Sequence, residues 1–150
     1  MTLITTNTAS GVTTSNFTAS IDSTYKLFIF KFYDINPESN AVYFQFNGSV
    51  DAGSNYNVTK VGTVFNAYNN EADDARELTY WAGIDTLGTG YAPLIGGLGS
   101  EADQNAAGTL WLFNPSNTTY VTHFCATFNA SAEPDASYAN YTAGYFNTTD

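Results

Sequence analysis

Four residues near the middle of the chain carry side chains that could bind a sugar. Tyr80 and Trp81 are followed by Asp85 and Tyr91, with small polar residues between them. Aromatic rings stack on the C–H faces of sugars, while carboxylates and hydroxyls bind sugar hydroxyl groups. Tyr80, Trp81, Asp85 and Tyr91 are therefore candidate glycan contacts. The alternative is that Trp81 and its neighbours close one end of a β-sandwich or lie in a subunit contact.

A short acidic segment is the second group with chemical potential. It contains Glu71, Asp73, Asp74 and Glu77. Several oxygen ligands suit Ca²⁺, but the spacing matches no defined calcium loop and Arg76 lies in its midst. A glycosidase pair could also be chosen from these carboxylates, although any acidic protein offers such pairs. We expect a solvated acidic loop and no metal or cofactor.

His123 and Cys125 are two residues apart on a predicted strand, so their side chains leave the same face. Together they supply half of a zinc site, but the chain has no other His or Cys to complete it. We expect a packed cysteine and a hydrogen-bonded histidine instead. A single cysteine also excludes an intrachain disulfide.

The composition excludes several classes of function. Among 150 residues there are 4 Lys or Arg and 14 Asp or Glu, which gives a net charge of −10. So few cations cannot neutralise a run of phosphates, and they give little attraction to an anionic membrane. No apolar run approaches the roughly 20 residues of a spanning helix, and the first residues lack the pattern of a signal peptide. We expect no nucleic-acid binding and no membrane insertion.

Alternation of apolar and polar residues predicts short β-strands separated by turns. The predicted strands are Thr24–Ile35, Ala41–Asn47, Tyr56–Tyr68, Gly108–Asn114, Thr119–Asn129 and Tyr141–Asn147. Between them, Asn69–Leu78 could form one helical turn with Asn70 as its cap. The Gly-rich segment Gly83–Asn105 is predicted to be mostly loop, longer than connections usually are.

This pattern predicts an all-β, single-domain antiparallel β-sandwich or jelly roll. The domain would span residues 1–150, with residues 1–20 as an extended N-terminal arm. We also expect a homo-oligomer, because dense aromatic residues can serve subunit contacts as well as a core.

Several segments, taken in order, resemble a family of small virion proteins and fibre-tip domains of tailed phages of marine bacteria, cyanophages included. The segments are Ile21–Pro37, Gly53–Lys60, Phe65–Asp73, Gly88–Leu94 and Gly108–Phe124. Each is weak alone, and together they cover most of residues 21–128.

The resemblance implies a β-sandwich structural protein of the phage particle without enzymatic activity. It would lie on the virion surface as a capsid decoration (knob or cement) protein or a tail-fibre domain, in contact with major capsid or tail proteins. Relatives continue past Gly144–Asp150 with further strand-forming sequence, so either the last strand is absent or a partner chain supplies one, and both options leave an edge strand that invites pairing. The alternative function is a carbohydrate-binding module that recognises host surface glycans through the Tyr80–Tyr91 region.

Overall fold

A computed structural model describes residues 1–132 and 135–148 of the chain, and these residues form strands and loops but no helix. The strands are β1 (Leu27–Ile35), β2 (Val42–Phe46), β3 (Lys60–Asn70), β4 (Arg76–Tyr80), β5 (Thr86–Gly88), β6 (Ala92–Leu98), β7 (Ala106–Phe113), β8 (Thr122–Ala132) and β9 (Ala136–Phe146). The predicted all-β class is confirmed.

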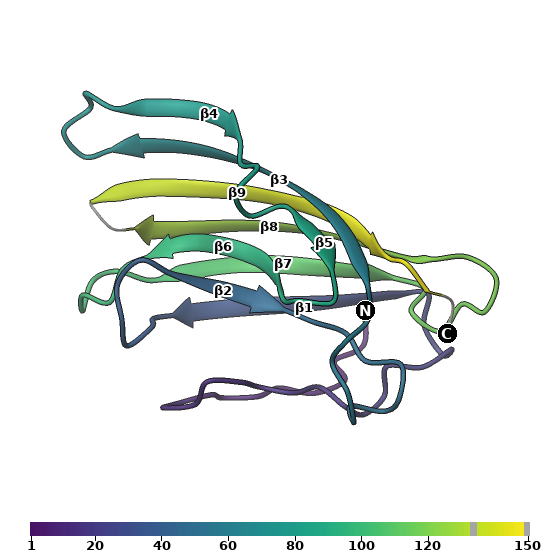
Figure 1. Ribbon diagram of the computed structural model, residues 1–150. Coiled ribbons are helices and arrows are strands. Elements are labelled where there is room, and N and C mark those ends of the chain that lie inside the picture. Colours follow the sequence, from purple (N-terminus) through teal and green to yellow (C-terminus); the bar gives the residue numbers. More distant parts are fainter. Residues whose placement is uncertain (133–134, 149–150) are drawn as a thin grey trace.

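Six of the strands form the main antiparallel sheet, in the order β1-β7-β8-β9-β3-β4. β5 pairs with the beginning of β3 and so lies beside the same edge as β4. β2 and β6 pair with each other in front of the main sheet, and the Leu98–Ala132 pair joins them to it. Figure 1 shows this smaller layer lying over one face of the larger one. The arrangement is a β-sandwich with layers of very unequal size.

The core lies between these two layers. Even-numbered residues of β1, β7, β8, β9 and β3 point toward β2 and β6, because alternate side chains of a strand leave opposite faces. The exception follows a bulge after Phe32 in β1, where Ile35 packs against the core and Asp34 is exposed. The Phe32 and Phe44 rings lie 5.1 Å apart, and the Phe46 and Phe124 rings 4.9 Å apart, with edge-to-face geometry in both pairs. Aromatic packing thus joins the small layer to the large one.

The prediction that residues 83–105 are mostly loop is wrong. This segment contains β5 and β6, and β6 is the most completely buried strand of the fold. All residues of β6 except Gly97 are buried, whichever way their side chains point, so both of its faces are covered. A strand covered on both faces shows no alternation of polar and apolar residues, so the sequence does not identify it as a strand. Its glycines Gly96 and Gly97 also resemble those of a loop.

The predicted helical turn at residues 69–78 is also wrong, because this segment forms the hairpin between β3 and β4. Asn70 does act as a cap, but of the hairpin turn. Its Oδ1 accepts hydrogen bonds from the backbone N–H groups of Asp74 and Ala75, at 3.2 and 3.0 Å. Asp73 adopts a positive φ of 56°, which breaks any helical continuation.

The last strand is interior rather than at an edge. β9 pairs with β8 on one side and with β3 on the other along its whole length. The edges of the main sheet are therefore β1 and β4.

Residues 1–26 precede the first strand without helix or strand, and the purple segment in Figure 1 runs out and turns back, with Asn7 Nδ2 donating a hydrogen bond to Ser15 Oγ at 2.6 Å. Every residue from Met1 to Asn16 is exposed. Phe17 is half-buried and packs its ring edge-on against Phe30, with centroids 5.5 Å apart. We call residues 1–16 the N-terminal arm.

Candidate functional site

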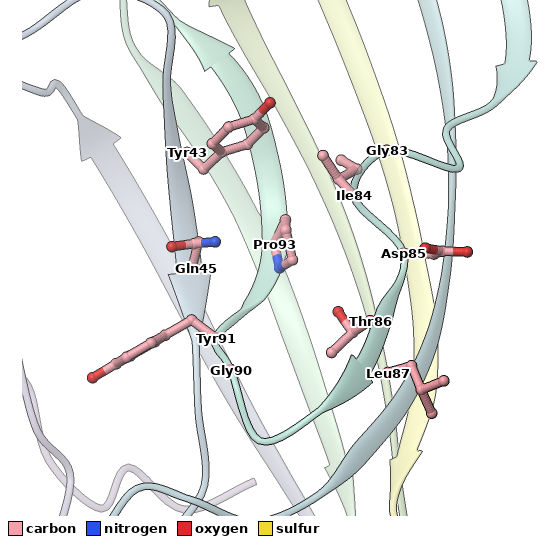
Figure 2. A pocket seen from close by; sticks show the side chains of 10 residues that line it. All are labelled: Tyr43, Gln45, Gly83, Ile84, Asp85, Thr86, Leu87, Gly90, Tyr91 and Pro93. Atoms are coloured by element: carbon pink, nitrogen blue, oxygen red, sulfur yellow. The ribbon is translucent and has the colours of Figure 1, made fainter.

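An open pocket lies between the β2–β6 layer and the segment that leads into β5. It has a volume of about 320 Å³, and Tyr43 and Gln45 of β2 form one side together with Pro93 of β6. Figure 2 shows Ile84 and Thr86 directed toward this side from across the pocket. Both residues are buried, so the wall they form is fixed by packing.

The four predicted glycan contacts surround this pocket without converging on it. Asp85 and Tyr91 belong to its lining, but Figure 2 shows the Asp85 carboxylate pointing away, over β3, and the Tyr91 ring extending in the opposite direction. Tyr80 lies outside the pocket and donates a hydrogen bond to Asp85 Oδ2 at 2.8 Å. This hydrogen bond to a carboxylate raises the pKa of Tyr80.

Trp81 supports the pocket from behind. Its ring lies 6.4 Å from the Tyr43 ring and packs over Gly96, where an added Cβ would come within 3.2 Å of the indole. Trp81 is half-buried in this position. The structure thus gives Trp81 packing contacts with Tyr43 and Gly96, at the back of the pocket.

Tyr43 and Gln45 are pocket residues that the sequence did not indicate. They belong to β2, some 40 positions before Tyr80 and Asp85 along the chain, and only the pairing of β2 with β6 brings them to the pocket. Their alternation with Val42, Phe44 and Phe46 was the available signal, since it places Tyr43 and Gln45 on the face away from the core.

The other sequence candidates have structural roles. Asp73 forms an exposed ion pair with Arg76 at 2.8 Å, and Asp74 accepts a hydrogen bond from Asn70 Nδ2 at 2.7 Å. Within the described residues, no group of three or more His, Cys, Asp or Glu side chains is arranged to hold a metal ion. Cys125 is half-buried opposite Trp111, and burial raises the pKa of its thiol.

A second candidate surface is the face of the main sheet that β2 and β6 leave uncovered. It consists of the odd-numbered residues of β7, β8, β9 and β3 and of β1 as far as Tyr33, with Asp34 after the bulge in β1, and we call it the outer face. Among its exposed apolar side chains are Leu27, Ile29, Tyr33, Phe65, Phe113 and Tyr141. The rings of Phe65 and Tyr141 stack at 4.8 Å with an angle of 11° between their planes.

A shallow hollow of about 410 Å³ lies on the outer face, toward the end where β7 begins. Small residues, among them Ala107 and Ala139, form its floor, while Tyr33 and Tyr141 rise beside it. Its polar groups come from Lys31, Thr109, Thr127 and Asn129. Asn129 Nδ2 is already bound to the Tyr138 carbonyl at 2.8 Å.

The carboxylates are distributed very unevenly over the described chain. Most lie at the end of the sheet where β1, β3 and β8 end, which we call the acidic end: Asp34, Glu38, Glu71, Asp73, Asp74, Glu77, Glu101, Asp103 and Asp135. On the outer face the described strands carry two charged side chains: Lys31 and, after the bulge near the end of β1, the exposed Asp34, whose Oδ1 accepts a hydrogen bond from Asn105 Nδ2 at 3.2 Å. Asp85 lies at the margin of this face, bound to Tyr80.

Comparisons of the chain with models of protein families, with curated proteins and with solved structures give no match. Among the described residues, the structure contains no helix of the length and apolar character needed to span a bilayer.

Proposed function

We propose that this chain is a non-enzymatic structural protein of a bacteriophage particle, exposed on the virion as a capsid decoration protein or as a tail-fibre domain. The sequence resemblance suggests this class. The structural observation that carries the proposal is the N-terminal arm together with the rigid all-β body to which it is attached.

The arm has the properties of a segment that docks on another protein. Residues 1–21 contain no charged side chain, and Met1, Leu3, Ile4 and Val12 are exposed. Burial of such apolar groups against a partner is favourable, and the absence of charge removes a desolvation cost. In this proposal the arm attaches to a capsid or tail protein, while the sandwich is displayed on the particle surface.

Immunogold electron microscopy of intact phage particles tests the location. Label over the head would support a decoration protein, and label confined to the tail would support a fibre domain. Absence of label from particles that contain the gene would overturn the proposal.

A truncation tests the role of the arm. A variant without residues 1–16 keeps Phe17 on Phe30 and should fold normally, but it should not bind to particles that lack the native protein. The matched control is Leu78→Ala in the full-length chain, which removes an apolar side chain 72% exposed on β4, at the edge of the sheet opposite β1 and away from the arm in Figure 1. Equal binding of the truncated and full-length chains would show that the arm is not the attachment segment.

A second candidate function is recognition of host surface glycans, and the observation that favours it is the pocket beside β2. Tyr43 and Tyr91 offer aromatic surface there, and Gln45 and Thr86 offer hydrogen-bonding groups. Binding to a glycan array should be lost in Tyr43→Ala and in Trp81→Ala, which removes the support of Tyr43. It should persist in Leu78→Ala, whose 72% exposed side chain does not belong to the pocket lining. Binding unaffected by the first two changes would exclude this pocket as the glycan site.

A further inference from the structure

The outer face has the composition of a protein interface rather than that of a solvated sheet. Tyr33 is 70% exposed, and Leu27, Ile29 and Phe113 are between 37% and 42% exposed, all on two adjacent strands. Half-buried Trp111 lies among them, directly opposite Ile29. Apolar surface gathered on this scale on a soluble domain marks a contact with another molecule.

The distribution of charge over the molecule allows a second copy of this chain to bind the outer face. Two molecules that each carry a net charge of −10 repel one another wherever their carboxylates meet. The outer face is the part of the described sheet where two copies can meet with the fewest opposing carboxylates, since its charged side chains are Lys31 and, only at the acidic end, Asp34. The few other cations lie off this face or, as with Lys60, inside the core.

The area of the face matches what a stable dimer buries. Five strands about 4.8 Å apart, with about 10 residues each at about 3.3 Å per residue, cover about 800 Å². A standard protein interface buries about 800 Å² on each partner.

The shape of the outer face is complementary to itself under one two-fold rotation. On β1 and β7, the raised apolar group Leu27, Ile29, Trp111 and Phe113 lies at one end, and the hollow beside Tyr33 and Ala107 lies at the other. A two-fold axis in the plane of the face, perpendicular to the strands near Phe30, brings the raised group of each copy over the hollow of the other. The same operation places the two acidic ends at opposite ends of the pair, where their repulsion is weakest.

We propose that the outer face is a homodimer interface, in which two main sheets pack face to face with their acidic ends apart. This inference goes beyond the proposed function and does not depend on it, because the contact needs no phage component.

The test is sedimentation velocity of the purified full-length chain, with variants that place a carboxylate on the face. The native chain should sediment as a dimer, with twice the 16.2 kDa mass of the chain. Thr127→Glu and Ile29→Asp should weaken association by at least about 100-fold, because each dimer then buries two new negative charges. Tyr120→Asp is the matched control: its side chain is 72% exposed in the β7–β8 loop, and it should remain dimeric. Circular dichroism verifies that each variant is folded.

Cross-linking gives a readout that requires no destabilising substitution. Cys125 belongs to the outer face near the middle of β8, so the proposed axis brings the two Cys125 residues of a dimer near one another. A short bifunctional maleimide should join two native chains, and Cys125→Ser should abolish the product. A native chain that is monomeric and does not cross-link, or a dimer that Thr127→Glu and Ile29→Asp leave intact, would overturn the inference. A solution dimer without label on particles would instead remove the proposed function and leave this interface standing.

Discussion

At the residue scale, the least expected side chain is Lys60, which is completely buried at the start of β3. Its Nζ donates hydrogen bonds to Asn47 Oδ1 at 2.5 Å and to the Val58 carbonyl at 2.9 Å, and it lies 5.7 Å from the centre of the Phe146 ring. No carboxylate in the described structure forms a salt bridge with it, so neutral oxygens and a ring face solvate the ammonium. Burial lowers the pKa of Lys60 to about 8.

This lowered pKa predicts that stability increases with pH in the alkaline range. Between about 8 and the ordinary lysine value of 10.5, the unfolded chain holds a proton that the folded chain has released. The contribution of Lys60 to the free energy of unfolding should therefore rise by about 2 kcal/mol between about pH 7.5 and about pH 9.5, while Cys125, whose pKa is raised, opposes this rise over the same range. Urea unfolding at a series of pH values measures this free energy of unfolding.

Lys60→Met is the matched control for that measurement. It keeps the length of the side chain and removes the titrating group, while Asn47 Oδ1 still accepts a hydrogen bond from the Gly48 N–H at 2.9 Å. The rise with pH should disappear in this variant. An identical rise in both proteins would assign the effect to other groups.

At the element scale, the main sheet depends on a glycine pair where β3 meets β9. Gly62 and Gly144 lie directly opposite each other, and the Phe124 ring of β8 packs beneath them. A Cβ on Gly144 would come within 2.3 Å of the Val61 carbonyl and 2.6 Å of Phe124 Cζ. Backbone is one of these neighbours, so the clash cannot be relieved by a side-chain rotation.

Gly144→Ala should therefore destabilise the fold by about 1–3 kcal/mol, the usual cost of overpacking a core. Gly90→Ala is the control, since a Cβ there meets nothing within 4 Å, and it should be neutral or slightly stabilising. Thermal unfolding followed by circular dichroism compares the two variants. Equal midpoints for both would mean that β3 and β9 can separate enough to admit the methyl group.

The sequence predicted those strands whose two faces differ. In β2, Val42, Phe44 and Phe46 alternate with Tyr43 and Gln45, and the predicted and observed bounds nearly coincide. β6 was missed because the covering of both its faces removes any alternation, and its glycines resemble those of a loop. Strand order was also beyond reach, since the pairing of β3 with β9 joins residues about 75 positions apart and leaves no local signal.

The candidate site was predicted less completely than the strands. Tyr80 and Asp85 are close in sequence, and they do meet in a hydrogen bond. Tyr43 reaches the same region only through the β2–β6 pairing, and the outer face depends on which side of the main sheet β2 and β6 cover. The spacing of residues along the sequence shows neither the β2–β6 pairing nor the side of the main sheet that these strands cover. The outer face could therefore not be identified from the sequence.

At the scale of the whole molecule, the uneven distribution of charge sets how stability responds to salt. At the acidic end, the β3–β4 turn contacts the β8–β9 turn through a hydrogen bond from the Glu71 N–H to the Asp135 carbonyl at 2.9 Å, which brings like charges together. Asp51, among the other carboxylates, is stabilised instead: hydrogen bonds from Ser49 and Asn55 lower its pKa to about 2.

Removal of one negative charge should therefore change the thermal midpoint in opposite directions at Glu71 and at Asp51. Glu71→Gln relieves repulsion and should raise the thermal midpoint, whereas Asp51→Asn weakens a hydrogen-bonded turn and should lower it. Added salt should raise the midpoint of the native chain by a few degrees, on the order of 1 kcal/mol at about 2–4 °C per kcal/mol, and should raise that of Glu71→Gln by less. Differential scanning calorimetry at low and high NaCl measures all three proteins. A higher thermal midpoint in both variants would mean that net charge alone governs stability. A higher midpoint in Glu71→Gln with a lower one in Asp51→Asn would place the repulsion at the acidic end, and the proposed dimer keeps the acidic ends of its two subunits far apart.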